Sequence, residues 1–263
     1  MPDLEIVDAF HNVFRKNIVH IQANTSEQQA AAWYGTGCMI GFLRNPKHEP
    51  WAVIITAGHL LRGAKGHRVQ WTVSRVMPGA RSIRTVNFCT HAAEDPDGYG
   101  FTYYLKDPRV DIGALFAKSR CEDGQPFVEW EGEGDKQWFF PNVIGKGIGM
   151  SEGTRVAWAG FPAHANSSLG HPVLCYYEGV VSAVIDEKDH PPLYLLDGHN
   201  TWGVSGGPVW AWNEGRKRTE LIGIIVNYLS CADEEVRLPG HVTAVAIHPI
   251  LMYFTAKYGT AWS

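Results

Sequence analysis

Short strand-like segments separated by turns run along almost the whole chain, and they constrain its fold more than any other feature. One group fills the first half of the chain, and a second group begins after residue 150. The segments are 17–22, 37–43, 51–56, 68–75, 82–89 and 112–117, then 155–160, 173–177, 179–185, 193–196, 208–212, 220–227 and 241–246. The 28 glycines and 15 prolines supply the turns that many short strands need. The pattern predicts an all-β fold of two packed antiparallel six-stranded β-barrels.

Short helices flank the predicted barrels at both ends of the chain. Residues 3–15 place Ile6, Phe10 and Phe14 on one helical face, and Pro249 suits the first turn of an apolar C-terminal helix. A polar, glycine-containing stretch separates the two groups of strands. We therefore expect an N-terminal helix at 1–16, a first barrel at 17–125, a linker at 126–147, a second barrel at 148–246 and a C-terminal helix at 247–263.

The composition argues against several classes of function. The net charge of −4 gives no basic surface for nucleic acid, and no apolar run approaches the ~20 residues of a membrane span. The five cysteines lack C-x-x-C spacing, so free thiols are expected instead of a zinc site or a disulfide framework. The N-terminus lacks the pattern of a signal peptide. We expect a cytoplasmic protein without metal, cofactor, nucleic-acid or membrane partner, although a secreted chain without its leader fits some of these facts.

Residues 203–208, Gly-Val-Ser-Gly-Gly-Pro, are the strongest chemical signal in the chain. Glycines on both sides of Ser205 allow a tight turn that presents the hydroxyl, with backbone N–H groups directed at a substrate oxygen. A serine alone is a weak nucleophile, so this chemistry needs a base and an orienting acid elsewhere. Both have candidates upstream.

His59 and Asp111 are the candidate base and acid. His59 follows an apolar strand and two small residues, which leave room for an imidazole to turn toward a cleft. Asp111 opens an otherwise apolar strand, where a carboxylate needs a partner such as an imidazole N–H; a bond to backbone is the simpler alternative. Asp95 and Asp107, in proline-flanked loops, are weaker candidates. The base and acid would come from the first barrel and Ser205 from the second, so that a peptide substrate crosses the seam.

With these residues in place, the chain resembles the chymotrypsin/trypsin-fold serine proteases, in particular the bacterial-type high-temperature-requirement (Deg) trypsin-like peptidases. The resemblance covers most of residues 17–250 and lacks the peptide-binding PDZ domain of the Deg type. Its motifs follow family order: Gly-Thr-Gly at 35–37, Thr-Ala-Gly-His at 56–59, Asp-Ile-Gly-Ala-Leu at 111–115, Gly-Phe-Pro at 160–162, Glu-Gly-Val-Val-Ser-Ala at 178–183, and 197–208.

The resemblance implies a serine endopeptidase with a role for each candidate. Ser205 would attack the scissile carbonyl, His59 would carry the proton, and Asp111 would hold the imidazole. The N–H groups of Gly203 and Ser205 would form the oxyanion hole. The substrate pocket would be built from His199, Asn200, Val226, Asn227, Tyr228 and Gly240.

No acid stands at the expected floor of this pocket, so a strict preference for lysine or arginine is not expected. His199 there favours acidic or polar side chains, whereas Tyr228 would shorten the pocket for small ones. Both alternatives stay open.

Two residues beside the serine depart from the family pattern. Val204 stands where secreted members carry an acid that pairs with a newly cut N-terminus, so we expect an enzyme that needs no zymogen cleavage. Trp202 either narrows the cleft or simply packs.

Two other functions satisfy part of the pattern. Gly-x-Ser-x-Gly is also the nucleophile elbow of α/β-hydrolase esterases, but that fold needs a helix directly after the serine, and Pro208 opens a strand-like segment instead. The second alternative is a catalytically silent protease-fold module that binds partners through its cleft.

Overall fold

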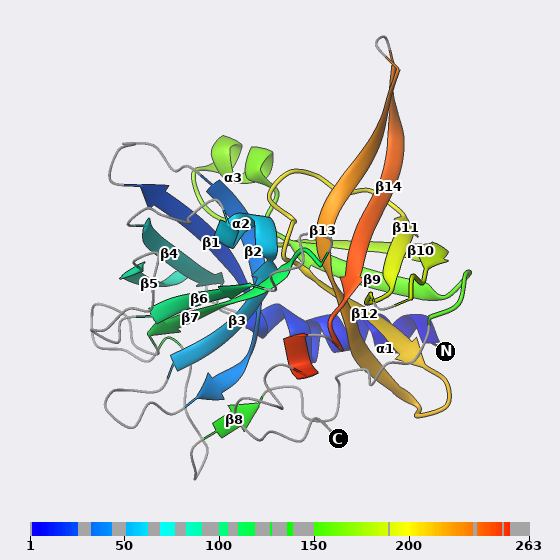
Figure 1. The fold of residues 1–263 in the computed structure, drawn as a ribbon, viewed down its shortest axis with the longest axis horizontal. Helices are drawn as coiled ribbons and strands as arrows, with labels where there is room; N and C mark the ends of the chain where they lie inside the picture. The colour runs from blue at the N-terminus through cyan, green and yellow to red at the C-terminus, as the bar shows by residue number, and fades with distance from the viewer. Residues whose placement is uncertain are drawn as a thin grey trace.

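The computed structural model describes residues 2–25, 33–43, 51–62, 69–76, 83–90, 100–104, 110–118, 127, 136–138, 150–188, 190–233, 236–248 and 250–252. Two β units lie side by side, as Figure 1 shows. Both are antiparallel, and the predicted all-β, chymotrypsin-like fold class is confirmed.

Among the described residues the first unit has eight strands, where six were predicted. Seven form the path β5-β4-β1-β2-β3-β7-β6, and β8 pairs with β2. Their bounds are β1 Ile18–Thr25, β2 Trp33–Leu43, β3 Trp51–Ala57, β4 Val69–Val76, β5 Ile83–Thr90, β6 Gly100–Tyr104, β7 Ile112–Lys118 and β8 Lys136–Trp138. The sequence pattern does not predict β6 and β8, because both are short and stand next to polar, turn-forming stretches. The strand β8 lies inside the predicted linker, whose boundaries stay a prediction.

The second unit is a closed barrel of six strands in the order β10-β11-β14-β13-β12-β9. The strands are β9 Arg155–Gly160, β10 Cys175–Ile185, β11 Leu193–Asp197, β12 Pro208–Asn213, β13 Arg218–Asp233 and β14 Val236–Ala246. The two segments predicted at 173–177 and 179–185 are one strand, β10. Gly179 is not a break between strands; it allows close approach of β11, because a Cβ there would clash with the Asp197 carbonyl oxygen. Beyond the barrel, β13 and β14 continue as a long two-stranded ribbon (Figure 1).

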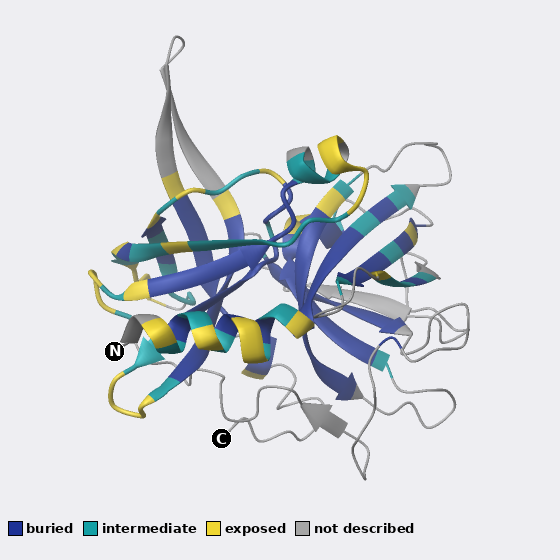
Figure 2. Ribbon diagram, turned by 180° about the vertical axis from the view of Figure 1, so that it is seen from behind, coloured by how far each residue is buried: buried dark blue, intermediate teal, exposed yellow. Residues whose placement is uncertain are grey.

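The N-terminal residues form a helical segment that packs on the second unit. It consists of α1 Pro2–Ala9, a π-helical turn Phe10–Phe14 and a 3-10 turn Arg15–Asn17. The Phe14 ring stacks on the Trp210 ring at 4.4 Å between centroids, and Trp210 Nε1 donates to the Ile6 carbonyl at 3.2 Å. Figure 2 shows the buried and exposed residues alternating along this segment. At the other end of the chain, His248 and residues 250–252 are helical, and the rest of the predicted C-terminal helix lies outside the described residues.

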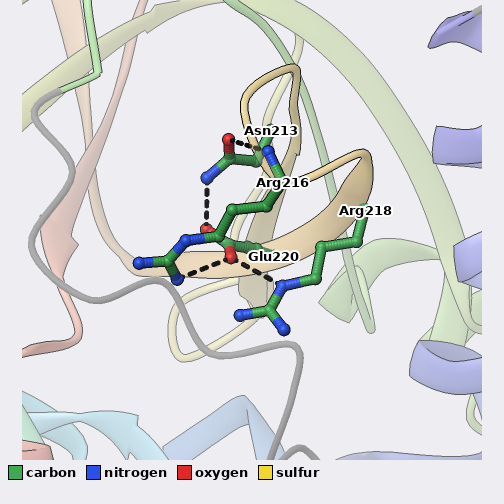
Figure 3. A network of polar contacts seen from close by, with 4 residues as sticks. All are labelled: Asn213, Arg216, Arg218 and Glu220. Atoms are coloured by element: carbon green, nitrogen blue, oxygen red, sulfur yellow. Dashed lines mark hydrogen bonds and ion pairs between the residues drawn. The ribbon is translucent and has the colours of Figure 1, made fainter. Parts of the chain in front are cut away.

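The hairpin between β12 and β13 is closed by a buried carboxylate, shown in Figure 3. Glu220 is almost fully buried and accepts hydrogen bonds from Asn213 Nδ2 at 2.8 Å, Arg216 Nη1 at 3.0 Å and Arg218 Nε at 2.9 Å. Burial alone would raise the pKa of Glu220, but these donors bring it below its ordinary value. The network replaces the water that the carboxylate loses on folding.

Apolar side chains form a core inside each unit and a third core between them. Phe42 and Trp71 belong to the core of the first unit, and Trp158 and Leu196 to that of the second. The shared core joins Ile40 and Ile55 of the first sheet to Trp210 and Ile224 of the second barrel, together with Ile6, Phe10 and Phe14 of the N-terminal segment. This shared core brings the ends of the two β units together at the seam.

Candidate active site

The structure brings His59 and Asp111 into direct contact. Antiparallel pairing of β3 with β7 places Ala57 opposite Ile112, so the end of one strand lies beside the start of the other. The Gly58 N–H donates to the Asp111 carbonyl at 2.9 Å. Beyond it, His59 Nδ1 lies 2.5 Å from Asp111 Oδ2, with the histidine side chain 43% exposed and the aspartate 17% exposed. The imidazole is thus held on one edge by a carboxylate while its other face is open to solvent.

Arg62 is a third member of this cluster, which the sequence pattern does not predict. It stands three residues after His59 on the short helix α2, Gly58–Arg62, and this spacing places both side chains on the same face. Arg62 Nη2 donates to Asp111 Oδ1, so each carboxylate oxygen has its own cationic or N–H partner. The spacing to His59 was visible in the sequence, but arginines on helices are too common for spacing alone to single it out.

The predicted nucleophile Ser205 lies half-buried in the turn before β12. Two glycines in this turn have backbone conformations that disfavour other residues: Gly203 has φ +95° and Gly206 has φ +90°. A Cβ on Gly206 would also clash with the Thr36 carbonyl oxygen of the first sheet. Gly203 therefore serves the turn, and Gly206 serves both the turn and its close approach to the other β unit.

One backbone and one side-chain hydrogen bond join the Ser205 turn to the strands that lead to His59. The Thr36 N–H donates to the Ser205 carbonyl at 2.8 Å, and Thr56 Oγ1 donates to the Thr36 carbonyl at 2.6 Å. Thr56 stands three residues before His59. Ser205 thus lies in a turn bonded to β2 and His59 lies on α2 directly after β3, but among the described residues no hydrogen bond joins their side chains. Catalytic hydrogen bonds in unliganded enzymes are often long and tighten when substrate binds.

The N–H groups predicted to form the oxyanion hole have no acceptor among the residues that the structure describes. Within the described part of the chain, neither the Gly203 N–H nor the Ser205 N–H donates a hydrogen bond. Val204 between them is fully buried in the core of the second barrel. Trp202 is 87% exposed, so the packing alternative for this side chain is wrong. Among the described residues, the N–H groups on both sides of the buried Val204 are thus without an acceptor, and the neighbouring Trp202 side chain is exposed to solvent.

The predicted pocket residues come from segments before and after this turn in the chain. His199 and Asn227 are exposed and Val226 is buried, while Asn200 has a buried Oδ1 with no partner among the described residues. Tyr228 and Gly240 fall on β13 and β14, and their side-chain environments lie outside the description. The set therefore remains a prediction.

Several other expectations can be compared with the described residues. Cys38 and Cys175 are free thiols, and burial raises the pKa of both. No cluster of three metal-ligating side chains occurs among the residues in view. None of the helices described is long and apolar enough to cross a membrane. Pro208 begins the strand β12, so the helix that an α/β-hydrolase elbow requires is absent at this point of the chain.

A chymotrypsin-like pair of β units, with His59 and Asp111 on one and Ser205 on the other, defines a peptidase fold. Comparison with known proteins agrees with that class. The sequence model of the trypsin-like peptidase domain matches residues 35–224, and the chain belongs to this family.

Solved structures support the same fold. A Glu endopeptidase determined in complex with MPD matches with a TM-score of 0.54 at 12% sequence identity, over 93% of this chain and 90% of that chain. Comparison with curated proteins finds no match.

Proposed function

We propose that this protein is a serine endopeptidase in which Ser205, His59 and Asp111 carry the reaction. The observation that most supports this is the contact of His59 Nδ1 with Asp111 Oδ2 at 2.5 Å, next to a serine turn that is hydrogen-bonded to the strands leading to His59. The family supports a peptide substrate. The activity and the roles of the three residues are the proposal.

In the first half of the reaction, the Ser205 Oγ attacks the carbonyl carbon of the scissile peptide, and its proton passes to His59 Nε2. Asp111 accepts the Nδ1–H of the imidazole, which keeps Nε2 free as the proton acceptor. The carbonyl oxygen becomes an oxyanion, to which the N–H groups of Gly203 and Ser205 donate. Collapse of this tetrahedral species breaks the C–N bond, and His59 returns the proton to the leaving amine.

Water then attacks the acyl group on Ser205 by the same sequence. His59 takes a proton from the water, the C–O bond to Ser205 breaks, and the proton goes to the serine oxygen. The products are a carboxylic acid and a free serine hydroxyl. No metal or cofactor takes part in this scheme.

The direct test compares wild type, Ser205→Ala and Ser168→Ala in a peptidase assay and in labelling by a fluorophosphonate. Ser168 is an exposed serine on α3, Ala163–Leu169, and serves as the matched control. We expect wild type and Ser168→Ala to cleave peptide and to be labelled at Ser205, and Ser205→Ala to do neither. A properly folded wild type that is never labelled would favour the silent binding module.

The same labelled sample tests whether activation by cleavage is needed. Val204 is buried and uncharged, so it makes no ion pair with a new N-terminus. We expect the labelled species to have the mass of the uncut chain plus one adduct. Labelling confined to a fragment clipped near residues 15–35 would contradict this.

Substrate preference is proposed only in outline. The exposed His199 favours acidic or polar side chains, and one structural neighbour is a Glu endopeptidase; a pocket shortened by Tyr228 would favour small ones. A peptide library should show no strict preference for arginine or lysine, and His199→Ala should reduce any preference for glutamate. Strong cleavage after arginine would contradict this outline.

A further inference from the structure

Thr36 lies on β2 at the seam and is fully buried, and all three of its polar atoms contact other segments. Its Oγ1 donates to the Gly203 carbonyl at 2.7 Å and accepts from the Phe161 N–H at 2.9 Å. Its N–H donates to Ser205 and its carbonyl accepts from Thr56. One side chain of the first sheet therefore connects the serine turn to the segment that follows β9.

The hydroxyl of Thr36 has no substitute in this arrangement. The Gly203 carbonyl and the Phe161 N–H are both buried, and neither has another hydrogen-bond partner among the described residues. A hydroxyl can donate one hydrogen bond and accept another at the same time, whereas a methyl group can do neither. Removing the hydroxyl would leave two buried polar groups unpaired, and the peptide of the Gly203 carbonyl would keep only the hydrogen bond from the Val204 N–H to the Thr201 carbonyl at 3.3 Å.

The two peptide groups on either side of Gly203 are each held by a hydrogen bond to their carbonyl oxygen. The Trp202 carbonyl accepts from the Ala163 N–H at 2.7 Å, which fixes the plane of the peptide that carries the Gly203 N–H. In a trans peptide the N–H and C=O point in opposite directions, so the Gly203 N–H points away from Ala163. The next peptide carries the Gly203 carbonyl, which Thr36 holds.

The Ser205 N–H is aimed in the same way. The Val204 carbonyl accepts from the Gly207 N–H at 2.8 Å, and the Ser205 N–H therefore points to the opposite side. Both N–H groups are unused among the described residues. Thr36 holds the peptide between these two donors, and through Phe161 it also fixes the segment that supplies Ala163.

We propose that the Thr36 hydroxyl is a positioning group for the reaction, because it holds the Gly203 peptide so that the Gly203 and Ser205 N–H groups meet at one substrate oxygen. The inference rests on the proposed function. Val204 brings no charge to the turn, which is held by neutral hydrogen bonds from Thr36 of the first sheet and from Ile225 of β13. Thr36 acts through the two N–H donors and does not touch the substrate.

The test compares Thr36→Val, which keeps the shape but loses the hydroxyl, with Thr36→Ser, which keeps the hydroxyl. We measure kcat and KM on one peptide and the inhibition constant of a peptide aldehyde, which forms a tetrahedral adduct with the serine. Thr36→Val should lower kcat about 10- to 100-fold with KM changed less than about 3-fold, and weaken aldehyde binding by the same factor as kcat/KM. Thr36→Ser should stay within about 3-fold of wild type.

Thr72→Val is the matched control. Thr72 lies on β4 of the same unit, and its hydroxyl donates to Asn87 Oδ1 at 2.9 Å, away from the serine turn. Thr72→Val should lower thermal stability without weakening the binding of the peptide aldehyde. If Thr36→Val does not fold, Thr36→Cys, whose thiol is a weak donor, should still reduce kcat and aldehyde affinity together.

The outcomes separate this inference from the proposed function. If folded Thr36→Val or Thr36→Cys bound the aldehyde as tightly as wild type, the positioning role of Thr36 would be wrong, but the proposed function would stand. A wild type that neither cleaves peptide nor is labelled at Ser205 would overturn the proposed function itself. A higher KM and a lower thermal stability in Thr36→Val, with kcat unchanged, would show that Thr36 has only a structural role.

Discussion

At the scale of single residues, the carboxylate of Asp111 is held from both sides. His59 contacts Oδ2 and Arg62 contacts Oδ1, and both side chains come from one turn of α2. Gly58 makes room for this cluster, because a Cβ there would lie 3.0 Å from Arg62 Nη1 and 3.1 Å from Asp111 Oδ1. A carboxylate with two fixed oxygens cannot rotate, so the imidazole it holds is fixed as well.

Arg62→Gln should therefore lower kcat by about 10- to 100-fold while KM changes little, since a misplaced base costs rate more than binding. Arg62→Lys should recover part of the loss, because an ammonium can donate to the same oxygen. The downfield proton resonance of the His59 Nδ1–H should weaken in Arg62→Gln. Lys217→Gln, which removes an exposed ion pair with Glu214, is the control and should change neither measurement. Wild-type kcat in Arg62→Gln would contradict the positioning role.

His20 predicts a dependence of stability on pH. It lies on β1 opposite Thr36, is only 5% exposed, and packs against the rings of Tyr34 and Phe161, with Nε2 lacking a partner among the described residues. Burial lowers the pKa of His20 from 6.5 to about 4. Between these values the unfolded chain binds the proton and the native state does not, so the free energy of unfolding rises with pH.

Stability should accordingly fall as the pH drops from about 6.5 to about 4, by on the order of 3 kcal/mol, and this contribution should level off below that. Urea unfolding of wild type and His20→Leu across this window measures the effect. The difference in unfolding free energy between the two proteins should shift in favour of His20→Leu as the pH falls. A difference that does not change with pH would show that His20 is not the group responsible.

At the scale of elements, the N-terminal segment stabilises the second barrel and the seam. Phe14 is fully buried and stacks on Trp210 of β12, while Thr219 Oγ1 of β13 donates to the Glu5 carbonyl of α1 at 3.3 Å. A helix of this length has little stability alone, so its packed face must hold it. The segment then leads directly into β1 of the first sheet.

Phe14→Ala should lower the free energy of unfolding by about 3–5 kcal/mol, because it removes a buried ring and leaves a cavity. Leu4→Ala, on the exposed face of the same helix, should change it by less than about 0.5 kcal/mol. Chemical denaturation of the two variants measures both values. Equal losses would mean that the helix is not packed as described.

At the scale of the whole molecule, the shared core joins both β units and the N-terminal segment. Neither unit can unfold without exposing that core, so the chain should unfold in one cooperative transition. Far-UV circular dichroism and tryptophan fluorescence should give coincident urea curves; buried reporters lie in all three cores, at Trp71, Trp158 and Trp210. Two separated transitions would show that the units are independent.

The sequence predicted the strands best where each is long and apolar. It failed where a strand depends on pairing with a distant segment of the chain. Three-residue β8 exists because it pairs with β2, and no local pattern in its polar surroundings announces that. A glycine inside a strand pattern predicts a break at Gly179, but in the structure the missing Cβ lets β11 approach. Both errors concern contacts between distant segments.

The sequence by itself was enough to determine the class of fold, the family motifs and the three candidate residues, because strand alternation, small-residue flanks and a glycine-bracketed serine are local patterns. Only the tertiary structure decided that Arg62 shares the Asp111 carboxylate and that Thr36 holds the Gly203 peptide. The Thr36 hydrogen bond spans 167 residues of chain. A hydrogen bond across such a separation depends on how the two β units pack, and packing leaves no mark in the residues next to either partner.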